Sequence, residues 1–308
     1  GVFDGRGHTI VHLTIKGETG LALFGTLWGE VKDLGIVDVN VIAGSVHTGA
    51  LVGTNNGDVT RCYSTGSVSG SYITGGLVGT NAGSIAMSYS SASVSGWSHT
   101  GGLVGENSGG SIAASRSSGL VRGLGMCVGG LVGDNGGSIA VSYSEASVTG
   151  NGTYVGGLVG NNYGGSIVRS YSSGLVTYTA NVGGVVGWGK AAKVMASFWD
   201  IETSGQATSA GGTGKTTAEM QTAKTFLEAG WDFVGETANG TEDIWKIAEG
   251  LDYPRLSWEP YDGRVTLELG QIFTVTLESN PSTGYRWEWV DHQDSIVEQM
   301  GEAQFKPR

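Results

Sequence analysis

Apolar residues in the first two thirds of the chain come in short groups separated by glycine-rich segments, and no 3.6-residue helical rhythm is present. One phrase, Gly-Ala-Leu-Val-Gly at residues 49–53, returns five more times with small variations, and its closing glycines lie 26 to 28 residues apart. A period this regular predicts one supersecondary unit stacked on copies of itself. The closing glycines are Gly53, Gly79, Gly105, Gly133, Gly160 and Gly187.

Three apolar positions recur in each unit, beginning with Leu51, Val59 and Val68, and their spacing predicts the fold. At about 3.3 Å per extended residue, a unit of about 27 residues fits a coil of three short strands joined by turns. Stacked coils bury the apolar residues that a single coil leaves exposed, because the backbone of each coil pairs with that of the next at about 4.8 Å. We therefore predict an all-β fold, a right-handed parallel β-solenoid over residues 1–199, with the winding direction taken from the preference of crossover connections.

Two polar columns follow from the same register. Five asparagines stand two residues after the closing glycines, and their stacked amides are expected to hydrogen-bond as a ladder along the axis. Four tyrosines form a second column, in which Arg116 and Phe198 replace tyrosine. We interpret both columns as structural stacking; a tyrosine platform for a ligand is the alternative. The ladder residues are Asn55, Asn81, Asn107, Asn135 and Asn162, and the tyrosines are Tyr63, Tyr89, Tyr143 and Tyr171.

The repeated phrase, its trailing Asn-x-Gly-x-Ile and its Ser-Tyr-Ser closely resemble the bacterial GLUG repeat of large secreted or surface proteins. The opening residues 3–10 and the Leu-Phe-Gly at 23–25 are similar to the lead-in of such solenoids. The resemblance covers about two thirds of the chain. It implies a solenoid fold and an extracellular or cell-surface location, and it implies no chemistry.

The repeat pattern ends near Trp199, and residues 200–261 are predicted to form a cap. Aromatic residues are frequent between Trp231 and Leu256. We expect them to cover the end of the solenoid, since an uncovered terminal coil is an exposed pairing edge. A similar tail is common in GLUG-bearing proteins.

One helix is predicted within the cap, over residues 216–229. Thr216 and Glu219 form a capping-box pattern, and Gly230 stands where the helix should end. The glycine-rich run 211–215 just before it is similar to a shortened phosphate-binding loop, but one glycine that the pattern requires is replaced. We interpret the run as a hinge leading into a capped helix.

Residues 262–308 differ again, because apolar residues alternate in three short segments that predict strands. Before the third segment stands a loop that closely resembles the signature of chagasin-type inhibitors of papain-like cysteine proteases. The resemblance implies an immunoglobulin-like β module whose loop enters the protease cleft, pre-shaped by its proline and glycine. The family's two further loops have no counterpart in the sequence, so we expect little inhibition from this chain alone, and a β module for display or spacing is the alternative. The loop residues are Asn280, Pro281, Ser282, Thr283, Gly284 and Tyr285.

Composition narrows the classes of partner. The chain of 308 residues carries 56 glycines, 4 prolines and a formal charge of −11, and 19 acidic residues accompany 10 basic ones after Gly187. No basic stripe is present for a nucleic-acid backbone, and no apolar run approaches the roughly 20 residues of a membrane span. Cys62 and Cys127 occupy different positions in distant coils, so we expect two free thiols.

Few side chains are candidates for chemistry. His47 and His99 share a position in the repeat but stand two coils apart, which is too far to hold one metal ion. Glu106 and Asp134 occupy one position in adjacent coils and form the best pair of carboxylates, which we interpret as solvated turn residues. We therefore predict no catalytic, cofactor-binding or metal site.

The predicted function is that of a non-enzymatic scaffold, secreted or on a bacterial cell surface, for adhesion or assembly. Its partner would be a protein, a surface glycan or another copy of the chain. One alternative is a carrier of a chagasin-type inhibitor module, with a papain-like cysteine protease as partner. Another is a carbohydrate-binding or carbohydrate-active β-helix, which rests on architecture alone.

Overall fold

The computed structural model describes residues 1–259 except 19, 45, 178–180 and 191–192. By its contacts the chain divides into two compact units, Gly1–Arg264 and Val265–Arg308. The first unit contains the solenoid together with its cap. The strands and the inhibitor-like loop predicted within residues 262–308 lie outside the described residues.

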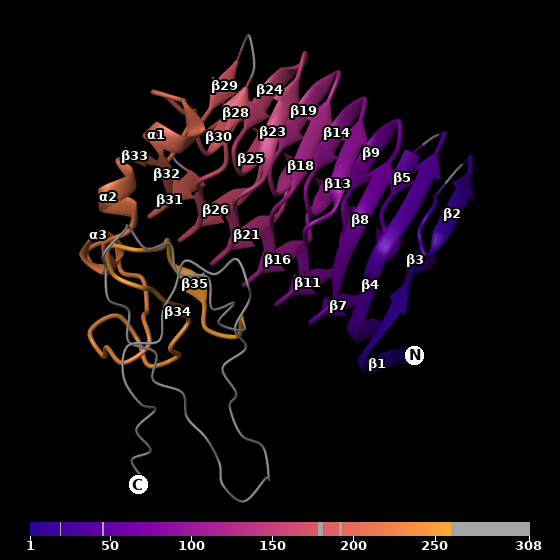
Figure 1. The fold of residues 1–308 in the computed structure, drawn as a ribbon, viewed down its shortest axis with the longest axis horizontal. Helices are drawn as coiled ribbons and strands as arrows, with labels where there is room; N and C mark the ends of the chain where they lie inside the picture. Colours follow the sequence, from indigo (N-terminus) through magenta and orange to yellow (C-terminus); the bar gives the residue numbers. More distant parts are fainter. Residues whose placement is uncertain (19, 45, 178–180, 191–192, 260–308) are drawn as a thin grey trace, which may run out of the picture. The chain divides into compact units, whose positions relative to one another are not determined.

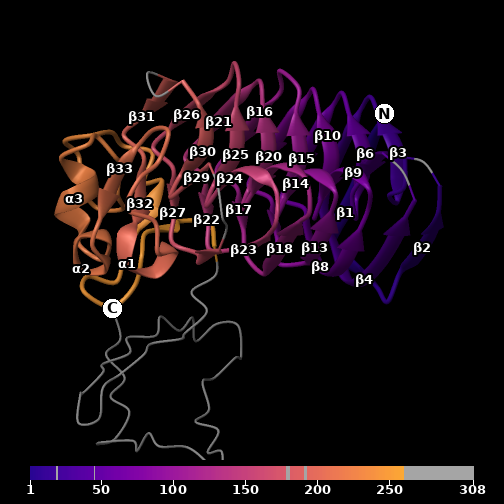
Figure 2. The ribbon, with the colours of Figure 1, turned by 90° about the horizontal axis from the view of Figure 1, so that it is seen from above.

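Successive coils stack along one axis and pair in parallel, which confirms the predicted all-β parallel solenoid (Figure 1; Figure 2). A seven-stranded sheet carries the repeated phrase, in the order β3 (Phe24–Leu27), β6 (Val52–Asn55), β10 (Val78–Asn81), β15 (Val104–Asn107), β20 (Val132–Asn135), β25 (Val159–Asn162) and β30 (Val186–Gly189). A six-stranded sheet runs in the order β29 (Val182–Gly183), β24 (Thr153–Gly156), β19 (Met126–Gly129), β14 (Ser98–Gly101), β9 (Tyr72–Gly75) and β5 (Val46–Thr48).

The largest sheet has twenty strands and begins with the long N-terminal strands β1 (Val2–Val11), β2 (Thr14–Gly17) and β4 (Glu30–Ala43). Its first row is β7 (Asp58–Thr60), β11 (Ser84–Ala86), β16 (Ser111–Ala113), β21 (Ser138–Ala140), β26 (Ser166–Val168) and β31 (Val194–Met195). Its second row is β8 (Tyr63–Ser69), β12 (Tyr89–Ser90), β17 (Arg116–Ser117), β22 (Tyr143–Ser144), β27 (Tyr171–Ser172), β32 (Phe198–Asp200) and β33 (Thr213–Lys215). A third row is β13 (Ser93–Gly96), β18 (Leu120–Gly123), β23 (Ser147–Gly150) and β28 (Val176–Thr177), and it joins the second at β8.

The interior is lined by the aliphatic columns that the repeat predicts. Leu77, Leu103 and Leu131 have no exposed surface, and Ile85 and Val94 are buried in the same way. Register explains the columns, because equivalent residues of neighbouring coils pair directly: Val78 with Val104, and Ile85 with Ile112. Each coil therefore buries its apolar residues against the coil before it and the coil after it.

A coil contains five short strands, where the sequence predicted three. The coil of residues 72–96 consists of β9, β10, β11, β12 and β13. The break between β11 and β12 is a sharp corner at which Met87 (φ 48°) adopts the left-handed backbone region, and His99 (φ 46°) adopts the same region within β14. Such corners are costly for an L-residue, and here the neighbouring coil fixes them, because the Met87 N–H donates to the Ala113 carbonyl at 3.1 Å.

The cap contains short helices rather than the single helix predicted over residues 216–229. They are α1 (Ile201–Ser204), α2 (Thr217–Met220) and α3 (Ala223–Leu227). The predicted capping box at the start of α2 is present. The chain breaks after α2 because Thr222 is extended and the Glu249 carboxylate accepts the Ala223 N–H at 2.9 Å. None of the helices in the described residues is long and apolar enough to cross a membrane.

The end of α3 and the rest of the cap follow local rules. Gly230 has a left-handed backbone (φ 80°). Its N–H donates to Leu227, and the Trp231 N–H donates to Phe226, the hydrogen-bond pair that terminates helices at a glycine. Two antiparallel strands, β34 (Trp245–Lys246) and β35 (Arg255–Leu256), complete the cap.

A leucine pair tests the register of the core. Replacing Leu103 with Ala is expected to lower the free energy of unfolding by about 2–5 kcal/mol, since it leaves a cavity in a fully buried column. The same change at Leu120, which is 42% exposed, should cost far less. Urea unfolding followed by tryptophan fluorescence measures both, and equal losses would contradict the assigned columns.

Candidate functional site

Two columns of side chains face each other where the six-stranded and seven-stranded sheets meet. The histidine column lies on the six-stranded side at left-handed corners and consists of His47, Ile73, His99, Cys127, Tyr154 and Asn181. The carboxylate column lies on the seven-stranded side and consists of Thr54, Thr80, Glu106, Asp134, Asn161 and Trp188. The columns contact each other with an offset of one coil, so residues about 34 positions apart meet.

The offset brings His99, Cys127 and Asp134 together, with one possible donor atom of each within 4.8 Å of the others. His99 Nε2 lies 3.9 Å from Asp134 Oδ2. These residues come from β14, β19 and β20, so two successive coils build the cluster. An imidazole, a thiol and a carboxylate are the groups that bind d-block dications. This grouping is the candidate functional site of the described residues.

Burial controls the protonation of the cluster. It raises the pKa of the Cys127 thiol to about 12, and the nearby charge of Asp134 acts in the same direction. Burial also raises the pKa of Asp134; His99 opposes this shift and Glu106 adds to it. A thiol in this setting stays protonated near neutral pH, so Cys127 lacks the thiolate that a nucleophilic cysteine requires.

Glu106 and Asp134 are not the solvated turn residues predicted from the sequence. They lie inside β15 and β20 and pair directly in register, and the Asp134 side chain is only 23% exposed. From the sequence alone, His99, Cys127 and this carboxylate pair were predicted to lie apart. Their meeting depends on the one-coil offset between the two columns, which residues at equal positions of the repeat do not reveal.

The five asparagines named from the sequence form one continuous ladder. Each side-chain Nδ2 donates to the Oδ1 of the next asparagine at 2.8 Å, from Asn55 through Asn162. The amides are buried, and the Asn55 amide also donates to the Ser84 carbonyl at 3.2 Å. The ladder ends where Gly189 pairs with Asn162 and offers no amide. Its role is structural, because its polar groups are directed at one another.

The tyrosine column is largely covered by the cap. Tyr143 and Tyr171 stack at a centroid distance of 4.8 Å and are fully buried. They pack with Phe198 against the cap residues Met220, Phe226, Trp231, Phe233, Trp245 and Leu256. The cap, which was predicted to cover the end of the solenoid, thus also covers part of its side (Figure 1). A ligand platform made of the whole column is excluded by this packing.

Polar contacts fix the cap on the column. The Tyr171 hydroxyl donates to the Pro254 carbonyl at 2.7 Å, and the Tyr143 hydroxyl donates to Glu259 at 2.8 Å. Arg116, which interrupts the column, lies over the Tyr89 ring at 4.3 Å and forms an ion pair with Glu259 at 2.8 Å. Burial raises the pKa of Tyr143 well above its ordinary value. The neutral hydroxyl therefore stays in place as a donor over the whole physiological range of pH.

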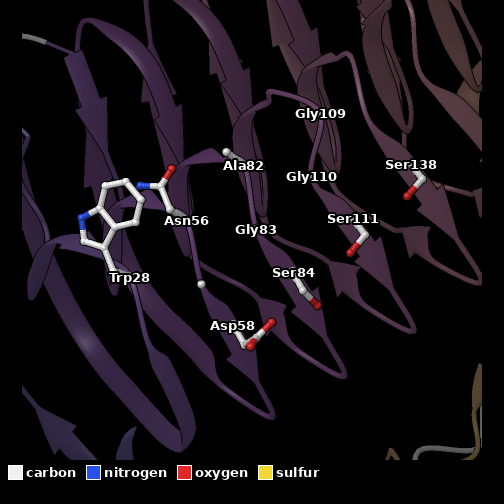
Figure 3. Close-up of a pocket in the computed structure, with 11 residues that line it drawn as sticks. Trp28, Asn56, Asp58, Ala82, Gly83, Ser84, Gly109, Gly110, Ser111 and Ser138 are labelled. Carbon is white, nitrogen blue, oxygen red and sulfur yellow. The ribbon is translucent and has the colours of Figure 1, made fainter. Parts of the chain in front are cut away.

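A shallow groove follows the glycine-rich turns after the ladder (Figure 3). Trp28, which is 79% exposed, stands at one end, and Ser84, Ser111 and Ser138 line it. Its floor is backbone, because a Cβ on Gly83 would lie 2.0 Å from the carbonyl oxygen of an adjacent coil. The groove offers hydroxyls and main chain to a partner, and Asp58 is the only ionisable residue among those lining it.

Other sequence candidates have structural roles. The run 211–215 does not form a phosphate-binding loop: its last three residues are β33, which pairs with β32. Lys215 binds the Glu219 carboxylate at 3.0 Å. Both cysteines are free and buried, as expected. The loop Asn280–Tyr285 lies outside the described residues.

Comparisons with known proteins address the fold and the C-terminal segment. Residues 266–308 match the family described as Chagasin family peptidase inhibitor I42. A comparison with curated proteins finds no match. Among solved structures, one described as a putative immunoglobulin A1 protease from Bacteroides ovatus is similar, with a TM-score of 0.56 and 21% identity over 84% of this chain and 77% of that one. At this identity the likeness shows the fold alone.

Removing one rung tests the ladder. In Asn107→Leu the Asn81 amide loses its acceptor at 2.8 Å and keeps only the Gly83 and Ser111 carbonyls at 3.3 Å, and the Asn135 oxygen loses its donor. The expected loss of unfolding free energy is about 1–3 kcal/mol, from the buried Asn135 oxygen left unpaired. Asn151→Leu, at an exposed position, serves as control. Urea unfolding curves that coincide for the two variants would contradict a stabilising ladder.

Proposed function

We propose that this protein is a non-enzymatic scaffold of the bacterial cell surface or exterior that presents a chagasin-type peptidase-inhibitor segment. The match of residues 266–308 to the chagasin family carries the inhibitor part of the proposal. The loop Asn280–Tyr285, which resembles the family's signature, lies within the matched residues. The partner in this proposal is a papain-like cysteine protease.

The regular packing of the coils supports the proposal that the protein is a scaffold. Each coil is held to the next by backbone pairing, by aliphatic columns and by the asparagine ladder, so the solenoid is stiff along its axis. Repeats of this kind present extended surfaces on which partners bind. Large aromatic side chains stand on this surface, among them Trp97 and Tyr163, which are 53% and 73% exposed. Exposed aromatic rings with polar surroundings suit protein or glycan partners. The resemblance to GLUG repeats supports the location.

Titration of papain tests the inhibitor part. We expect a protein in which the two further loops of the chagasin family are added after residues 266–308 to inhibit papain at micromolar concentration or below. Gly284→Trp should remove inhibition, because a bulky side chain in the loop prevents its entry into the cleft. Leu120→Ala, in the solenoid, should leave inhibition unchanged. Full papain activity at micromolar protein would contradict this part of the proposal.

Binding assays test the scaffold part separately. Sedimentation should reveal self-association, or pull-down on cells and glycans should reveal a surface partner that the isolated C-terminal segment does not bind. Absence of all three kinds of binding would contradict the scaffold. Product release from a polysaccharide panel would contradict the non-enzymatic role and favour the carbohydrate-active alternative.

A further inference from the structure

The kinds of side chain that meet between the facing histidine and carboxylate columns are unusual at one place along the axis. At one end of the corner, His47 Nδ1 and Thr80 Oγ1 form a hydrogen bond of 2.7 Å. At the other, Tyr154 and Trp188 pack with ring centroids 5.5 Å apart. Between these ordinary contacts the same geometry places an imidazole, a thiol and a carboxylate together. The repeat itself does not require this combination, because the other coils fill the corner with different side chains.

We propose that His99, Cys127 and Asp134 bind one zinc ion, and that the Cys127 thiol releases its proton to solvent as the Zn–S bond forms. Nitrogen, sulfur and carboxylate oxygen are the donors that zinc prefers, at about 2.0–2.3 Å from the metal. Those bond lengths place the donors of a tetrahedral site roughly 3.4 Å apart. The observed 3.9 Å between His99 Nε2 and Asp134 Oδ2 is near this value, and all three donors lie within 4.8 Å of one another. Small side-chain rotations therefore complete the site.

The backbone around the cluster is suited to hold a metal. Its residues lie on β14, β19 and β20, whose register is fixed by pairing with the coils on both sides. Donors on regular elements keep their positions better than donors on loops. Cys127 is buried, whereas the side chains of His99 and Asp134 are 30% and 23% exposed. One side of the site thus reaches solvent, which gives the ion an entry path and leaves its fourth position to water.

Unpaired polar atoms are a second observation at this place. Asp134 Oδ1 and Asn161 Oδ1 are both buried, and neither has a hydrogen-bond partner of ordinary geometry, although the Asn161 side chain lies near enough to Cys127 and Asp134 to lower the pKa of both. Asn161 pairs in register with Asp134 on the adjacent strand. Buried oxygens without partners are rare and need an explanation. A cation with bound water beside these oxygens supplies the missing positive charge and donors.

Binding would tie two successive coils together at the junction of two sheets. The ion would join β14 to β19 and β20, in addition to the hydrogen bonds already present. A ligand that binds only the folded chain raises its apparent stability with concentration. Zinc should therefore raise the melting temperature of the protein, and a chelator should reverse the shift.

Cobalt titration of the whole chain tests the site, since Co²⁺ replaces Zn²⁺ and absorbs light. We expect one equivalent of Co²⁺ to give a thiolate charge-transfer band and strong tetrahedral bands, both removed by added Zn²⁺. Cys127→Ser should abolish the charge-transfer band. His99→Asn and Asp134→Asn should each weaken Co²⁺ binding at least about tenfold, as the loss of a ligand requires. Asparagine is chosen at position 99 because it tolerates the left-handed backbone there.

Matched controls separate this site from adventitious binding. Cys62→Ser removes the other buried thiol, and His47→Asn removes the histidine two coils away at the same position of the repeat. Neither change should affect the spectrum or the affinity. Absence of a charge-transfer band in the unaltered protein, or its persistence in Cys127→Ser, would overturn the proposal. If circular dichroism shows that Cys127→Ser does not fold, unchanged Co²⁺ affinity in both His99→Asn and Asp134→Asn would overturn it instead.

Discussion

The parallel pairing of each coil with the next is the constraint on which the rest of the structure depends. It sets equivalent residues of successive repeats side by side, so a residue type that recurs at one position of the repeat forms a column along the axis. Columns of aliphatic residues form the core, and the column of asparagines forms a ladder of 2.8 Å hydrogen bonds. Glycines allow the turns beside the ladder to approach closely, since a Cβ on Gly83 or Gly137 would meet a neighbouring carbonyl oxygen at 2.0 or 2.1 Å.

The same constraint explains how a repeated sequence acquires an individual site. Columns at a corner contact each other with an offset of one coil, so each side chain meets a partner from another repeat. A few substitutions in the coils around β14, β19 and β20 are then enough to assemble three different donor groups. The cap uses the tyrosine column in a comparable way, because Arg116 and Arg255 each join a tyrosine to an acidic residue.

Much of the solenoid was predictable because its amino-acid sequence is periodic. The spacing of Leu51, Leu77 and Leu103 alone implies a stacked core, and the ladder positions follow from the phrase. The left-handed corners were not predictable, since residues as different as Met87, Ala114 and Val141 occupy them. The break between α2 and α3 depends on Glu249, which is distant in sequence. The candidate site required the offset between columns, which no single repeat reveals.

Cross-linking of engineered cysteines tests the coil register most directly. Ser69 and Ser95 pair on adjacent coils with hydroxyls 3.1 Å apart, whereas Arg122 pairs with Ser95 and lies one coil further on. A disulfide requires Cα atoms within about 7 Å, and coils are spaced at about 4.8 Å. The account predicts that the Ser69→Cys/Ser95→Cys protein forms an intramolecular disulfide by mass spectrometry, and that Ser69→Cys/Arg122→Cys does not. Equal cross-linking of both pairs, or of neither, would contradict it.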